Sequence, residues 1–163
     1  MDTAFEFRAM RRKERQLPEE DAIRLLKDGE YGVLATYGED GWPYGVPVSY
    51  VYDDRRIYFH GAQTGHKLEN LRYCERASFT VVGDTHVLQE IYSTAYKSVI
   101  AFGSVRAVED GQEKVEVLVK LAEKYCYDNS IERTRSYAEK SLGNVGVYCM
   151  EIVHVTGKRR PEQ

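Results

Sequence analysis

The sequence of 163 residues lacks several features that would define its class at once. No run of residues approaches the roughly 18 consecutive apolar positions that a membrane-spanning helix requires. The opening residues do not combine a basic stretch with an apolar stretch, so no signal peptide is recognisable. The cysteines, Cys74, Cys126 and Cys149, are odd in number and form no CxxC pair, which argues against a disulfide framework. We therefore expect a cytoplasmic protein with reduced thiols and no membrane contact.

Motifs of hydrolytic and metal chemistry are also missing. The sequence contains no HExxH segment and no Cys/His cluster, so we expect no metal site. It contains no GxSxG segment, which argues against a serine hydrolase. The net charge of −3 gives no general attraction to nucleic acid, although residues 8–15 and 158–160 are locally basic. We expect no nucleic-acid partner.

The hydrophobic pattern indicates a mainly β (α+β) protein. Alternating apolar residues predict strands, the first three forming an antiparallel meander, at 33–36, 44–52, 56–60, 77–82, 98–108 and 145–155. Helical spacing and capping residues predict helices at 18–29, 66–73, 110–126 and 131–140. Residues 84–96 have no clear pattern, and Gly103 inside a strand predicts a bulge or a close approach of two backbones. About six strands with peripheral helices favour an antiparallel barrel.

No repeat or linker divides this pattern. We therefore expect residues 1–163 to form a single domain, with residues 1–16 as a basic N-terminal arm.

A candidate phosphate site lies between the third strand and the following helix. Lys67 falls in the first helical turn, where the helix dipole disfavours a cation unless an anion is bound nearby. Gly61 and Gly65 flank this start, but three residues separate them, whereas a P-loop has four. Lys67 either helps to seat a phosphate or extends into solvent without a ligand.

Two further segments could contact a ligand. His60 ends a strand just before a glycine and could exchange a proton, or it could be an ordinary solvated histidine. Gly45 and Pro47 lie within one strand, where they either let a flat ring approach the backbone or mark a twisted edge strand. The 13 tyrosines suggest a homodimer interface, although exposed strand faces would also accommodate them.

Together these segments resemble the FMN-binding split barrels of the pyridoxamine 5'-phosphate oxidase superfamily, and within it the nitroimidazole-resistance (Nim) proteins. The most specific part of the resemblance is the block from His60-Gly61-Ala62 to Gly65-His66-Lys67. The whole resemblance covers residues 10–158 and also includes residues 10–15, 32–36, 43–44, 47–48, 57–59, 98–99, Gly103 and 155–158.

The resemblance implies a six-stranded split β-barrel with peripheral helices that binds FMN at a homodimer interface. Val48, Ser49 and Tyr50 would lie along the flavin ring, and His60, Gly61 and Ala62 would lie beside it. Lys67 would lie at the phosphate, His66 would be a further cofactor-binding residue, and Ser98 of the same or the partner chain is a weaker candidate contact. His60 would be the catalytic residue, placed near the reactive part of the flavin.

Two departures limit what the resemblance implies. Cys74-Glu75 replaces an Asn-Pro that often follows the phosphate helix, which affects the expected loop shape. The Arg-x-His substrate signature of true pyridoxamine phosphate oxidases is missing, so that activity is not expected.

Two functions from different classes remain open. The first is an FMN-dependent oxidoreductase that passes electrons from an external donor to a small, nitroaromatic-like acceptor. The second is a non-catalytic carrier or sensor that binds flavin, or haem through His60.

Overall fold

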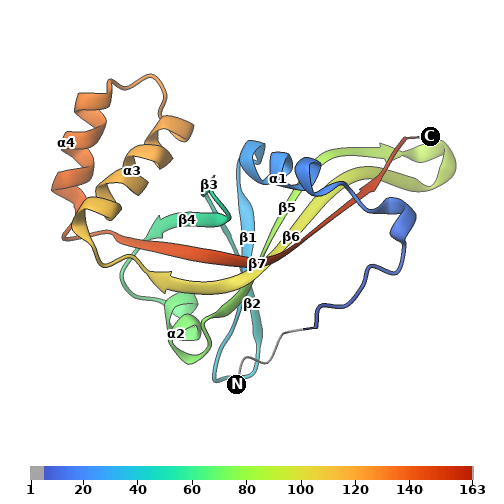
Figure 1. The fold of residues 1–163 in the computed structure, drawn as a ribbon, viewed down its shortest axis with the longest axis horizontal. Coiled ribbons are helices and arrows are strands. Elements are labelled where there is room, and N and C mark those ends of the chain that lie inside the picture. The colour runs from blue at the N-terminus through green and yellow to red at the C-terminus, as the bar shows by residue number, and fades with distance from the viewer. Residues whose placement is uncertain (1–5, 163) are drawn as a thin grey trace.

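The structure, a computed structural model, describes residues 6–162 and contains one seven-stranded antiparallel sheet. The strand order across the sheet is β2-β1-β5-β6-β7-β4-β3. The sheet curls around its core without closing into a continuous barrel, as Figure 1 shows. The strands are β1 Gly32–Tyr37, β2 Pro43–Val48, β3 Val51–Asp53, β4 Arg56–Gly61, β5 Arg76–Leu88, β6 Ser93–Ala107 and β7 Gly146–Arg160. The predicted mainly β architecture is confirmed, with seven strands in place of six.

The predicted meander is wrong at its second strand. Residues 44–52 divide into β2, which pairs with β1, and β3, which pairs with β4 at the opposite edge of the sheet. Only Ser49 and Tyr50 join the two edges. Val46, Val48, Tyr50 and Tyr52 nevertheless all pack on the same core. Every second residue therefore faces the core on both sides of the break. Alternation of apolar residues indicates which face of a sheet a side chain occupies, but it does not indicate which strand is the hydrogen-bonding partner.

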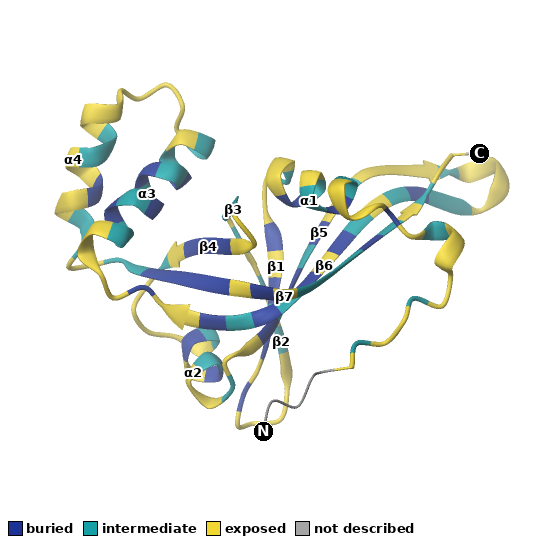
Figure 2. Ribbon diagram, viewed as in Figure 1, coloured by how far each residue is buried: buried dark blue, intermediate teal, exposed yellow. Residues whose placement is uncertain are grey.

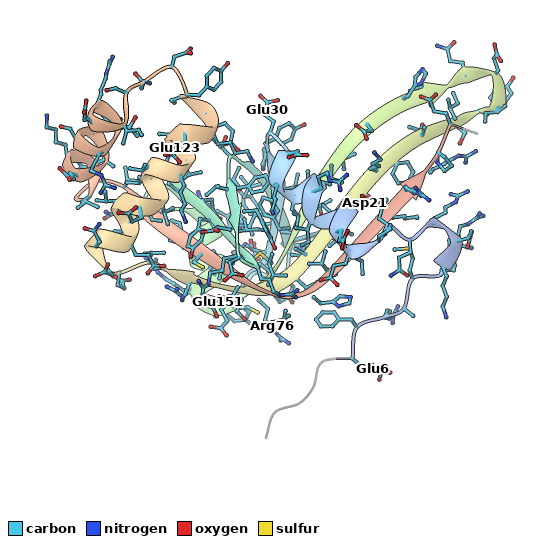
Figure 3. The ribbon with its side chains drawn as sticks, turned by 45° about the horizontal axis from the view of Figure 1, so that its top comes forward. Glu6, Asp21, Glu30, Arg76, Glu123 and Glu151 are labelled. Atoms are coloured by element: carbon cyan, nitrogen blue, oxygen red, sulfur yellow. The ribbon has the colours of Figure 1, made fainter. Side chains whose placement is uncertain are left out.

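Four helices accompany the sheet, close to their predicted bounds: α1 Glu19–Asp28, α2 His66–Tyr73, α3 Gly111–Tyr125 and α4 Ile131–Ser141. The main core lies on the inner face of the sheet, where α1 contributes the fully buried Leu26 beside Phe59 and Phe79. Figure 2 shows the corresponding alternation of buried and exposed residues along the strands. Helices α3 and α4 form a hairpin at one end of the molecule (Figure 1).

Helix α3 covers the outer face of β4 and β7. Val117 and Leu121 of α3 pack there against Tyr58 and the buried Cys149. Ala138 of α4 then packs on Val115 and Val119, which attaches α4 to α3 and leaves it without a place in the main core. The helical hairpin is thus carried by a second, smaller hydrophobic cluster.

Residues 84–96, which have no clear pattern in the sequence, complete a long β5–β6 ribbon. Strand β5 continues to Leu88, the short 3-10 turn Gln89–Ile91 follows, and β6 begins at Ser93. Inside β6 the pairing shifts between Phe102 and Gly103. A Cβ atom on Gly103 would lie 2.0 Å from the Glu151 carbonyl oxygen, so the predicted bulge and close backbone approach are both confirmed.

The basic N-terminal segment lies along the sheet. After the 3-10 turn Lys13–Arg15, Gln16 forms an isolated bridge with Lys158 of β7. Upstream, the Phe7 ring stacks on His154 with centroids 4.2 Å apart. Residues 1–5 of the expected arm lie outside the described residues. Among residues 6–162, no helix is long and apolar enough to cross a membrane.

Candidate functional site

A cavity lies between the β3–β4 end of the sheet and the α3–α4 hairpin. Its volume is about 730 Å³, which falls within the usual range for small-molecule and cofactor sites. It is lined by Ser49, His60, Leu118, Leu121, Ala122, Tyr125, Cys126, Asn129, Arg133, Thr134, Ser136, Tyr137, Ala138, Lys140, Ser141 and Val145. The predicted residues Ser49 and His60 therefore share one cavity wall. A second cavity of about 430 Å³ beside α2 contains none of the predicted residues.

Strand alternation places His60 in the cavity. Ile57 and Phe59 of β4 face the main core, so Tyr58 and His60 face α3 on the other side of the sheet. Partial desolvation lowers the pKa of the His60 imidazole below its ordinary value. The neutral ring is therefore the dominant form at pH 7, and it can donate one hydrogen bond and accept another.

A single tyrosine hydroxyl fixes the backbone at Ser49 and Tyr50. The Tyr125 hydroxyl accepts a hydrogen bond from the Tyr50 N–H at 2.9 Å. Its own proton is directed at the carbonyls of Glu30, at 2.6 Å, and Tyr50, at 2.9 Å. Desolvation raises the pKa of Tyr125, so the hydroxyl stays protonated and can both donate and accept. The last turn of α3 thereby holds the link between the two edges of the sheet.

Lys124 adds a second contact at the same place. Its Nζ donates to the Gly29 carbonyl at 2.7 Å and lies 4.2 Å from the centre of the Tyr50 ring. Burial of the ammonium lowers the pKa of Lys124. Gly29 follows the C-terminus of α1, where the helix dipole favours a cation. Helices α3 and α1 and the Ser49-Tyr50 link are consequently held together beside the cavity.

The predicted phosphate segment lies next to His60. Gly61 ends β4, and a Cβ atom there would lie 3.3 Å from Lys67 Nζ. Lys67 is half-buried at the start of α2 and has no ion pair among the described residues. The N-cap residue of α2 is Gly65, which has no side chain to cap the helix. Free N–H groups and an unpaired ammonium therefore meet at this helix start, where an anion would satisfy both.

Other predicted contacts lie elsewhere. The Tyr50 side chain is fully buried, with its hydroxyl donating to the Leu26 carbonyl at 2.6 Å, and Val48 also packs on the core. His66 is turned toward the β1–β2 turn, where its ring lies 4.1 Å from that of Tyr44. Ala62 follows β4 as an exposed residue, and its carbonyl accepts a hydrogen bond from Tyr148. Val48 and Tyr50 can thus offer a ligand only backbone atoms.

Ser98 is distant from the cavity within one chain. It pairs with Lys158 of β7, whereas His60 pairs with Val147 of the same strand. These β7 partners are 11 residues apart (158 − 147), about 35 Å of extended strand at ~3.3 Å per residue. Ser98 could reach such a site only from a partner chain.

The helical wall of the cavity was not predicted from the sequence. The apolar residues of α3 predict only a packed face, and α4 carries no motif of known chemistry. One signal was available in α4: Arg133, Tyr137 and Lys140 follow the i, i+4, i+7 spacing of a single helix face. Among residues 6–162, no group of three or more His, Cys, Asp or Glu side chains could hold a metal ion.

The open, curled antiparallel sheet, with its two edges joined by two residues and a cavity at that junction, defines a split-barrel protein. The chain belongs to the pyridoxamine 5'-phosphate oxidase family, which it matches over residues 18–159. None of the curated proteins matches the sequence significantly.

Solved structures share this fold. A Bacteroides thetaiotaomicron protein provisionally assigned to 5-nitroimidazole antibiotic resistance is 24% identical, with a TM-score of 0.77 over 88% of this chain and 86% of that one. The flavocytochrome Anf3 of Azotobacter vinelandii is 18% identical, with a TM-score of 0.77 over 94% and 72%. A FAD- and haem-binding protein of Mycobacterium smegmatis is 17% identical, with a TM-score of 0.70 over 89% and 73%.

The Tyr125 hydroxyl can be tested by removing one oxygen atom. Tyr125→Phe leaves the Tyr50 N–H without its partner, and an unsatisfied backbone group costs about 1–3 kcal/mol. We expect the free energy of unfolding, measured in urea, to fall by that amount. Tyr127→Phe is the matched control, because the Tyr127 side chain is 77% exposed. Equal stability of the two variants would show that the hydroxyl does not hold the link.

Proposed function

We propose that the protein is an FMN-binding oxidoreductase of the nitroimidazole-resistance type, which reduces a small nitroaromatic-like acceptor with electrons from an external donor. The observation that carries the proposal is the opening of His60 and Ser49 onto one cavity, with Lys67 beside the adjacent Gly61. A candidate ring site at His60 and a candidate anion site at Lys67 thus meet at the adjacent residues His60 and Gly61. The flavocytochrome and the FAD- and haem-binding protein with the same fold support a flavin as the ligand.

The described residues fit FMN. The apolar wall of α3, including Leu118 and Ala122, suits a flat aromatic ring, and Ser49 and His60 offer it polar contacts. Lys67 and the uncapped start of α2 suit the phosphate. The half-buried Lys67 has no carboxylate partner in the described chain, which is the arrangement expected of a cation that binds an external anion.

Bound FMN would supply the electron transfer between donor and acceptor. This chain's residues would orient the ring, exclude water on the α3 side and provide a proton donor. His60 suits the last role, because its neutral imidazole carries one N–H and opens onto the cavity. Tyr125 holds the backbone that carries Ser49 and so would position that wall without contacting the flavin ring itself.

The absorption spectrum of the purified protein tests the proposal. We expect a flavin spectrum that NAD(P)H or a reductase bleaches and a nitroaromatic acceptor restores. His60→Ala should retain the flavin and lower turnover about 100-fold or more, the contribution typical of a positioned proton donor. Collapse of flavin affinity with unchanged turnover per bound flavin would show instead that His60 is a cofactor contact.

Haem is the alternative ligand, and one observation favours it. A histidine open to an apolar cavity is a possible axial ligand, and two proteins of this fold are a flavocytochrome and a FAD- and haem-binding protein. A haem Soret band lost in His60→Ala, without any flavin absorption, would replace the proposed reductase with a haem carrier.

Lys67 gives the sharpest test of FMN itself. Because Lys67 would contact only the phosphate, Lys67→Ala should weaken FMN and leave riboflavin almost unaffected. A charge-assisted hydrogen bond contributes about 1.5–3 kcal/mol, so FMN affinity should fall about 10- to 150-fold. Flavin fluorescence quenching measures both ligands on wild type and variant. Equal losses for FMN and riboflavin would place Lys67 in the fold or the ring site, not at the phosphate.

We also propose that the protein is a homodimer. The outer face of the sheet carries ten residues in two paired rows without one Asp, Glu, Lys or Arg, and we call it the outer patch. Its members are Val33, Ala35, Gly45, Pro47, Ser78, Thr80, Ile100, Phe102, His154 and Thr156. A surface without charged side chains is typical of an interface, and Phe7 of the N-terminal segment lies at one corner of it, against Phe102 and His154. Pro47 lies on the same face as Ser49, so a second copy there would border the cavity.

Light scattering tests the dimer. We expect wild type at twice the chain mass of 18.8 kDa, because the outer patch is covered by its copy. Ile100→Glu should shift the mass to that of one chain, since the Ile100 side chain is 36% exposed and a buried carboxylate is costly. Val87→Glu is the control, because Val87 is 60% exposed on the β5–β6 ribbon outside the patch. A flavin-loaded wild-type monomer would contradict the proposal.

A further inference from the structure

The charge pattern of the cavity lining differs from that of the chain as a whole. Arg133 and Lys140 are the cationic residues that line it, and the same lining contains no Asp or Glu. His60 adds no negative charge, and its lowered pKa keeps it neutral at pH 7. The chain as a whole has a net charge of −3, so a cavity with two cations and no acid departs from the average of the protein.

Neither cation is neutralised within the described part of the chain. The ion pairs there include Arg135 of α4, whose guanidinium lies 3.2 Å from Glu116 of α3, but neither Arg133 nor Lys140. Arg135 does not line the cavity. In α4, Arg135 outside the cavity is therefore ion-paired, whereas Arg133 and Lys140 in the cavity lining are available to a ligand.

The helix places these cations on the same face as an aromatic residue. Arg133, Tyr137 and Lys140 lie on one face of α4, with the Tyr137 side chain 75% exposed between them. Across the cavity, Leu118, Leu121 and Ala122 of α3 form an apolar wall. The cavity thus combines an apolar side for a hydrophobic ring with a cationic rim for an anion.

We propose that the acceptor bound in this cavity is an anionic aromatic molecule, of which an aromatic carboxylate is the simplest case. Its ring lies against the apolar wall of α3, and its carboxylate lies between Arg133 and Lys140. That this ligand is the electron acceptor rests on the proposed function. The preference for an anionic aromatic ligand rests on the cavity alone. The phosphate of FMN is a second possible anion, and the experiment separates the two.

The experiment is calorimetric titration of the full chain, with and without added FMN, with 4-nitrobenzoate and with the uncharged 4-nitrobenzyl alcohol. We expect wild type to prefer the carboxylate about tenfold, the size expected of two solvent-accessible ion pairs. The double variant Arg133→Gln/Lys140→Gln should lose this preference, because the cations that hold the carboxylate are removed. Added salt should reduce the preference of wild type for the same reason.

Arg135→Gln is the matched control, since it removes a cation of the same helix outside the cavity and should keep the preference. Fluorescence titration completes the design: the double variant should bind FMN and riboflavin in the same ratio as wild type. A wild type without the preference, or a double variant that retains it, overturns the proposal. A double variant that loses FMN but not riboflavin also overturns it, because the two cations would then hold the cofactor phosphate. If wild type binds no flavin yet prefers the carboxylate, the proposed reductase fails and the anion site stands.

Discussion

The hydroxyl group of Tyr125 is the contact on which the geometry of the cavity depends. It holds the Tyr50 N–H and lies within hydrogen-bond distance of the Tyr50 and Glu30 carbonyls, at the one place where the two edges of the sheet are joined. A chain that leaves one edge strand and enters another exposes backbone groups that the sheet cannot pair. Tyr125 satisfies them from α3, and the same residue lines the cavity. The link between the two sheet edges and the wall of the candidate site therefore share one residue, Tyr125.

The sequence predicts the elements of this fold better than their connections. The four helices and the bulge at Gly103 follow from apolar spacing, capping residues and a glycine within a strand. The division of residues 44–52 does not, because Val46, Val48 and Tyr52 face one core from both edges of the sheet. Strand alternation contains no information about which neighbour a strand pairs with. The β5–β6 ribbon was missed for a related reason, since a two-stranded extension with exposed faces has little apolar alternation to detect.

The sequence predicts the part of the candidate site whose residues lie close together in the chain, and it does not predict the part that comes from distant segments. His60, Gly61 and Lys67 lie within eight residues of one another, and the resemblance to the split barrels rests chiefly on that segment. In the structure, the Lys67 ammonium lies beside Gly61 and the His60 side chain lines the cavity. The opposite wall comes from α3 and α4, more than 50 residues further along the chain (118 − 60 = 58 for Leu118 and His60), and was not predicted. Tyr50 shows that even a residue in a correctly predicted segment can be misassigned. The sequence does not reveal that the Tyr50 side chain lies in the core and that Tyr125 binds its backbone.

The two walls of the cavity differ in how firmly the fold constrains them. The wall with Ser49 and His60 is formed by backbone whose neighbouring residues, Tyr50 and Phe59, lie in the main core, so a shift of the backbone there would disturb that core. The wall formed by α4 is held to α3 by the small cluster around Ala138, Val115 and Val119 and by the Arg135–Glu116 ion pair. Its cavity-lining Arg133, Tyr137 and Lys140 are exposed. Exposed side chains on a separately supported helix can change at little cost in stability. A protein built in this way can therefore keep the wall of Ser49 and His60 unchanged while the cavity-lining side chains of α4, including Arg133 and Lys140, vary.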